Sequence, residues 1–116
     1  MKIYEGRRTM DGLVVTVDGA PLPEHYHVKQ FTKFGFEWTY EGDSPRQLAL
    51  AILFDYLGDA DRAAALSEPF MKSIIANLDN DWRLSSEDVA AFASQHQTRV
   101  LHALRRAPRR VPRRTA

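Results

Sequence analysis

Apolar and polar residues alternate near the start of the chain in the pattern of a β-hairpin. From Leu13 to Asp18, aliphatic residues on one side alternate with a more polar side, which is the period of a half-buried strand. Met10-Asp11-Gly12 separates this strand from an earlier one, Ile3–Thr9, and Asp-Gly is a strong hairpin turn signal. Asp18-Gly19 marks the next turn. The sequence therefore predicts an N-terminal antiparallel hairpin.

Two further strands are predicted after this hairpin. Tyr26–Phe31 has a weak strand pattern, and Phe34–Tyr40 has a strong one. On a strand, the second segment would place four aromatic side chains on one face: Phe34, Phe36, Trp38 and Tyr40. An aromatic face of this size needs a cover, and a helix is the usual one.

A helix is predicted directly after the aromatic segment. Ser44 is the expected N-cap, Pro45 suits the first helical position, and Gly58 is the expected residue at which the helix ends. Leu48–Leu53 is apolar nearly all round, so this helix is expected to be central. A second helical region, Ala60–Leu78, contains a proline.

That proline, Pro69, allows two interpretations: a kink, or a new helix that starts with Ser67 as its cap. Trp82-Arg83-Leu84 is a short extended piece. Ser85 and Asp88 then resemble a capping box, and a last helix is predicted from Ser86 to Leu104.

Strands first and helices afterwards indicate an α+β fold. We expect a small N-terminal antiparallel sheet of three to four strands, packed against two to three helices, in a single domain over residues 1–104. The chain has 116 residues and no cysteine, which excludes disulfides, zinc fingers and thiol catalysis. The N-terminus lacks the apolar core of a signal peptide, and no apolar run is long enough to span a bilayer. We therefore expect a cytoplasmic protein without membrane partners.

The net charge of +1 conceals a division of charge along the chain. Residues 1–104 hold ten Lys and Arg against fifteen Asp and Glu, a net charge of −5, whereas residues 105–116 hold six arginines and no acid. These arginines follow an Arg-Arg-x-Pro repeat: Arg105, Arg106, Arg109, Arg110, Arg113 and Arg114. Prolines block a helix and like charges repel, so the sequence predicts a disordered basic tail.

The tail has several candidate roles. It could neutralise phosphates of a nucleic acid without sequence preference, fold back on the acidic body, or act only as a solubilising segment. The acidic body offers a second surface. Its candidate interaction residues are Glu37, Glu41, Asp43, Asp55, Asp59 and Asp61. Together they could dock on a basic protein surface, or form an ordinary solvated face.

Glu37 is the one candidate functional acid. It lies between Phe36 and Trp38, on the strand face opposite the aromatic set. If that face is covered, burial would raise the pKa of Glu37 and make it a candidate functional acid; if the face is open, Glu37 is an ordinary solvated glutamate.

Other catalytic and metal-binding patterns are missing. His25 and His27 would share a strand face, but no third ligand lies nearby, so edge histidines are the better interpretation. The serines are explained as helix caps, and neither a nucleophile elbow nor a phosphate-binding loop occurs. The sequence thus predicts no metal, no cofactor and no enzymatic activity.

Three segments carry a resemblance to a known family. They are Tyr4-Glu5-Gly6-Arg7-Arg8-Thr9, Gly35-Phe36-Glu37-Trp38, and the run from Gly42 to Leu53 that begins Gly-Asp-Ser-Pro-Arg-Gln. With the Asp18-Gly19 turn, they make the chain resemble the domain of unknown function 6166 family over Met1 to Val89. The sequence departs from the family pattern at Thr39, where glycine is common, and at Gly42-Asp43, where a Gly-Ser pair is common.

The resemblance implies a small accessory protein of the kind found in bacteria, phages and mobile elements, and it carries over no catalytic residue. Our leading hypothesis is a non-enzymatic binding protein that docks its acidic face on a host defence or regulatory complex. The alternative is a nucleic-acid-associated protein that binds phosphates through the tail.

Overall fold

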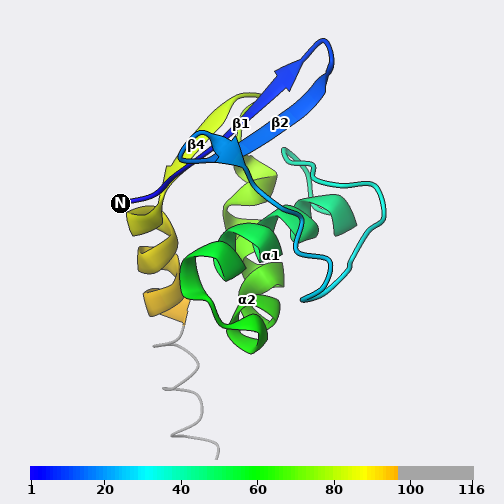
Figure 1. Ribbon diagram of the computed structural model, residues 1–116. Coiled ribbons are helices and arrows are strands. Elements are labelled where there is room, and N and C mark those ends of the chain that lie inside the picture. Colours follow the sequence, from blue (N-terminus) through cyan, green and yellow to red (C-terminus); the bar gives the residue numbers. More distant parts are fainter. Residues whose placement is uncertain (97–116) are drawn as a thin grey trace, which may run out of the picture.

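The computed structural model describes residues 1–96 of the chain, and their arrangement is a four-stranded antiparallel sheet packed on helices (Figure 1). The strands are β1 (Ile3–Thr9), β2 (Gly12–Val17), β3 (Ala20–Pro21) and β4 (Trp82–Ser85), in the order β3-β2-β1-β4. The helices are α1 (Asp43–Leu57), α2 (Ala60–Ser73), the short 3₁₀ helix η1 (Ile75–Asn77) and a last helix over residues 86–96. The predicted α+β class is confirmed.

The N-terminal hairpin forms as predicted, with β2 beginning one residue early at Gly12. Tyr4 lies opposite Val17 and Thr9 opposite Gly12. Hydrogen-bonded pairs alternate with non-bonded pairs along the ladder, and the closing pair of the tight turn is a bonded one. The hairpin extends beyond the helices at its turn (Figure 1).

The two predicted strands Tyr26–Phe31 and Phe34–Tyr40 are wrong, because the chain from Leu22 to Gly42 is irregular. Gly35 and Thr39 both have positive φ angles, 83° and 80°, which no regular strand allows. Of the four aromatic residues, only Trp38 is fully buried, and Phe34 is 80% exposed.

Gln47 of α1 satisfies backbone groups of this segment in place of a strand ladder. Its side chain is fully buried. Its carbonyl oxygen accepts from the N–H of Phe31 at 2.8 Å, and its amide donates to the carbonyl oxygens of Glu24 and Lys29 at 2.8 and 3.0 Å. Paired backbone groups allow the segment to lie against α1 without sheet structure.

The remaining strand of the sheet comes from the far end of the domain. Trp82-Arg83-Leu84, expected only to be extended, continues into Ser85 as β4, which pairs with β1 so that Gly6 lies opposite Trp82. The predicted capping box follows at once: Ser85 N–H donates to Asp88 Oδ2 at 2.9 Å, and Asp88 N–H donates to Ser85 Oγ at 3.1 Å.

The central helix α1 is confirmed, with one correction at its start. The N-cap residue is Gly42, and Ser44 does not cap the helix; its hydroxyl bonds to Thr32 Oγ1 at 3.1 Å. Gly58 ends the helix in the left-handed conformation as predicted, with its N–H donating to the Phe54 carbonyl at 2.8 Å. Nearly every residue from Pro45 to Leu53 is buried.

The second helix passes through Pro69 to Ser73, so the alternative of a restart capped by Ser67 is wrong. Ser67 is fully buried; its hydroxyl donates to the Ala64 carbonyl at 2.8 Å and accepts from Nε of Arg46 at 3.0 Å. The last helix starts at Ser86 as predicted. Its predicted end at Leu104, the domain boundary there and the predicted disordered tail lie outside the described residues.

Gly6 provides a test of the sheet packing. A Cβ atom at this position would collide with the indole ring of Trp82. We expect Gly6→Ala to lower the free energy of unfolding in urea by about 1–3 kcal/mol, because Trp82 must leave its place against Trp38. In the background of Trp82→Leu the same change should cost much less; an equal cost in both backgrounds would contradict the proposed collision.

Candidate functional site

A clamp formed by Arg8, Glu37 and Trp38 fixes the irregular segment against the hairpin. The Arg8 guanidinium donates to both oxygens of Glu37, at 2.8 and 3.3 Å, and to the carbonyl oxygen of Trp38 at 3.2 Å. It also lies 4.8 Å from the centre of the Trp38 ring, within the range of a cation–π contact. On the far side, Nε of Arg8 donates to Asn80 Oδ1 at 3.1 Å.

The clamp settles the charge of Glu37. Its hydrogen bonds with Arg8 hold the pKa of Glu37 below its usual range, against the opposing effect of partial burial. The side chain is about one third exposed, so it is neither enclosed nor freely solvated. Glu37 is therefore neither the buried acid of raised pKa nor the fully solvated glutamate that the sequence left open.

Beside the clamp lies a groove of about 480 Å³, which we call the Phe34 groove. The edge of β2 from Leu13 to Thr16 forms one wall, and Phe34–Phe36 forms the other. Pro21, Leu22 and Glu24 complete the lining. Its volume lies in the usual range for ligand pockets.

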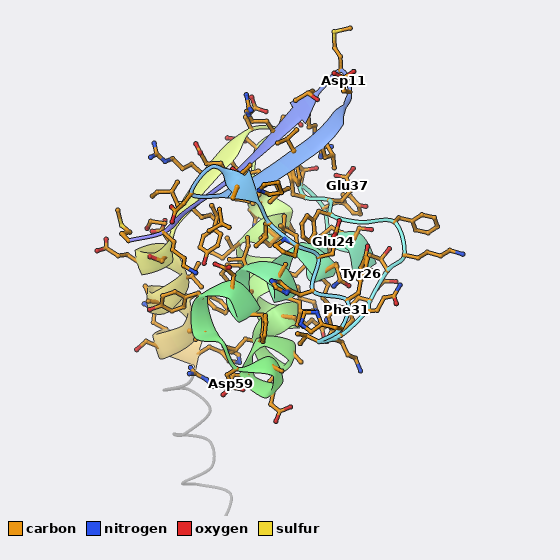
Figure 2. The ribbon with its side chains drawn as sticks, viewed as in Figure 1. Asp11, Glu24, Tyr26, Phe31, Glu37 and Asp59 are labelled. Atoms are coloured by element: carbon orange, nitrogen blue, oxygen red, sulfur yellow. The ribbon has the colours of Figure 1, made fainter. Side chains whose placement is uncertain are left out.

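Contacts on either side of the Phe34–Phe36 wall hold it in position. Gly35 N–H donates to the hydroxyl of Tyr26 at 3.0 Å, and Glu37 and Trp38 anchor the segment two residues further on. Figure 2 shows Glu24 and Tyr26 on the segment beneath this wall, with Glu37 nearer the hairpin. The groove is therefore a preformed feature with one strongly exposed aromatic ring, Phe34, at its rim.

The sequence of this chain matches one known protein family. Residues 4–95 match the model of a family of unknown function, DUF6166. The chain belongs to this family. No curated protein and no solved structure matches the chain. The DUF6166 assignment confirms the resemblance seen in the sequence, and it supplies no activity and no residue roles.

The candidate acidic residues of this DUF6166 protein do not form one surface. Glu41 and Asp43 lie at the N-terminal end of α1, whereas Asp59 and Asp61 lie beyond its C-terminal end. The helix has 15 residues, so about 22 Å separates its two ends. Figure 2 likewise places Asp59 at the opposite end of the body from Glu37.

Most of these acids also have a structural task. Asp59 caps α2 by accepting from Arg62 N–H at 3.1 Å, and Asp61 and Asp43 occupy first helical turns, where negative charge is favourable. Asp55 pairs with Lys2 at 3.0 Å and accepts from the Tyr4 hydroxyl at 2.8 Å. Burial, followed by this hydrogen bond, raises the pKa of Tyr4.

The two candidate histidines pack on an aromatic ring. His25 and His27 lie with ring centroids 5.4 Å apart, and each contacts Phe54 edge-on. Both ring nitrogens of His25 are buried without a hydrogen-bond partner, and burial followed by the neighbouring His27 lowers its pKa. Within residues 1–96, no three potential metal ligands lie together.

The remaining candidate interaction residues, Arg105, Arg106, Arg109, Arg110, Arg113 and Arg114, lie outside the described residues. Within the described part of the chain, no helix is long and apolar enough to cross a bilayer. Sequence reasoning missed the Phe34 groove because it assigned Phe34 to a buried strand face. The signal that could have revealed it is Gly35, since a glycine that needs a positive φ interrupts a strand.

The clamp makes stability depend on pH. The pKa of Glu37 is lower in the folded protein than in the unfolded chain, so its contribution is present above the unfolded value of about 4.3 and is lost as pH falls through the folded value. We expect Glu37→Gln to lower the free energy of unfolding at pH 7 by about 1 kcal/mol. The difference from wild type should shrink below pH 4, as measured by urea denaturation. A constant difference from pH 7 to pH 3 would contradict the pairing.

Proposed function

We propose that this protein is a non-enzymatic accessory protein that binds another protein through the Phe34 groove. The observation that carries the proposal is the ring of Phe34, which is 80% exposed at the rim of a preformed groove. Apart from a contact with Lys33 Nζ, 5.6 Å from its centre, the exposed ring buries little surface on folding, whereas aromatic anchors dominate protein–protein interfaces. Leu13 and Val14 on the opposite wall are also partly exposed.

Two further observations support a role without catalysis. Glu37 forms an ion pair with Arg8, and Asp55 forms one with Lys2. The serines considered from the sequence also have structural partners: Ser44 with Thr32, Ser67 with Arg46, and Ser85 with Asp88. Acidic and serine side chains that are held by such contacts are less available to act on a substrate.

Charge favours a basic partner. Residues 1–96 carry nine Lys and Arg and fifteen Asp and Glu, a net charge of −6, whereas residues 97–116 carry seven arginines and no acid, so the acidic part is the body and not the whole chain. Complementary charge speeds association and suppresses wrong partners. Under this proposal the acids at the two ends of α1 steer the encounter, and the groove supplies the contact. In a phage or mobile element, the partner would be a host defence or regulatory complex.

The groove can be tested by affinity capture from a lysate of the cells that contain the gene. We expect Phe34→Ser to reduce the recovered partner by about tenfold or more, because an interface anchor is lost. Tyr56→Ser is the matched control, because it removes an exposed aromatic ring near the C-terminal end of α1 that does not line the groove. Equal recovery with both variants, after nuclease treatment, would rule out the groove as the binding surface.

The six tail arginines favour a second candidate, a protein that binds nucleic acid. If all six contact phosphates, the logarithm of the binding constant for duplex DNA should fall with the logarithm of salt concentration with a slope of about −5. Deletion of residues 105–116 should abolish this binding and leave capture of a protein partner intact. A slope near zero, or binding that persists after the deletion, would exclude the tail as a phosphate-binding element.

A further inference from the structure

The outer edge of β2 offers free backbone groups to the Phe34 groove. In the ladder with β1, the closing pair Thr9 and Gly12 is hydrogen-bonded, so the even-numbered residues of β2 bond to β1. Asp18 N–H, which donates to the Ile3 carbonyl at 2.8 Å, follows the same alternation. The N–H and C=O groups of Leu13 and Val15 consequently point away from β1.

The neighbouring strand β3 covers only the far half of this edge. Its pairing with β2 ends at Thr16 and Pro21, and the last contact beyond it is Leu22 N–H to the Val15 carbonyl at 3.1 Å. After Pro21 the chain leaves the ladder and has no regular structure up to Gly42. From Gly12 to Val14, about 10 Å of strand edge therefore borders the groove without a strand partner in the described part of the chain.

This edge lacks the usual protection against added strands. Natural proteins blunt open edges with lysine, proline or bulges. Here the residues are Leu13 and Val14, and the hairpin projects beyond the helices (Figure 1). The groove alongside has a volume of about 480 Å³, and Phe34 and Phe36 line its opposite wall.

One charged group lies in the groove lining. Glu24 makes no ion pair within residues 1–96, although it lies among apolar side chains. A carboxylate in this position favours a lysine or arginine from the occupant, in agreement with the net negative charge of the described residues.

We propose that the Phe34 groove binds an extended segment of a partner protein, which adds a strand to the free edge of β2 at Leu13. The segment has apolar side chains at alternate positions, which reach Phe34 and Leu22, and a basic side chain that pairs with Glu24. Main-chain hydrogen bonds supply affinity and alternate side chains supply specificity, as in other cases of strand addition. This inference rests on the function proposed above and names the chemistry of the partner.

A positional-scanning library of acetylated heptapeptides, applied to the full chain at 0.15 M salt, provides the probe. We expect the peptides that bind to alternate apolar residues with at least one Lys or Arg, and to shift the backbone amide resonance of Leu13. Failure of every peptide to bind above background, or binding that leaves the Leu13 amide unmoved, would overturn the proposal.

Leu13→Pro removes the outward N–H without removing a bond to β1, since proline is tolerated where a strand N–H faces outward. We expect it to weaken binding of the best peptide about tenfold more than Leu13→Ala, which keeps the N–H. Circular dichroism and urea denaturation establish that both variants fold. Equal losses in the two variants would overturn strand addition.

Glu24→Gln tests the charge. It should weaken binding of a lysine-containing peptide about fivefold and leave its norleucine analogue unchanged. Equal effects on the two peptides would remove the basic residue from the proposal.

Two outcomes distinguish strand addition by a partner protein from other binding at the groove and from dimerisation of this chain. A captured protein that is lost with Phe34→Ser and retained with Leu13→Pro would leave the proposed function standing and overturn strand addition. A dimer in sedimentation equilibrium that Leu13→Pro dissociates, without any peptide binding, would identify a second copy of this chain as the occupant and overturn the peptide partner.

Discussion

The contact of Arg8 with Glu37 and Trp38 is the interaction on which the rest of the structure depends. It joins β1, the irregular segment before α1 and the turn before β4, which are far apart in the sequence. Arg8 reaches Asn80 from one side, and Trp38 Nε1 donates to the Asn80 carbonyl at 3.0 Å from the other. Trp38 then packs edge-on against Trp82, with ring centroids 5.7 Å apart. Because Trp38 is fully buried, the clamp is part of the core as well as of the surface.

The Phe34 groove follows from this constraint. The segment that carries Phe34 is fixed at one end by the clamp and at the other by Gln47, so it arches past the edge of β2 without pairing with it. A strand at this place would close the edge and bury Phe34. Irregular structure supported by side-chain hydrogen bonds instead leaves both the strand edge and the aromatic ring available. The features that define the fold of this DUF6166 protein therefore also position its candidate binding surface.

The acidic residues contribute in a different way from the groove. Most of the acids that looked like a single face in the sequence stabilise helix starts or hold the N-terminal strand, as Asp59 and Asp55 do. Their arrangement at two ends of α1 suits long-range attraction better than a local contact. Under the proposed function, the apolar groove would act at short range and the distributed charge at long range.

The sequence by itself determined the elements whose signals are local. The Asp11-Gly12 hairpin, the apolar helix that ends at Gly58 and the Ser85–Asp88 capping box depend on neighbouring residues, and each was predicted correctly. Only the tertiary structure decided the fate of Phe34–Tyr40. Its aromatic alternation predicts a strand, but the bonds of Arg8 to Glu37 and of Gln47 to Phe31 outweigh that preference. These partners lie 29 and 16 residues away, and local periodicity contains no record of contacts at such separations. The pairing of β1 with β4 is also a long-range contact, so local periodicity could not predict it. The free edge of β2 could not be predicted for the same reason.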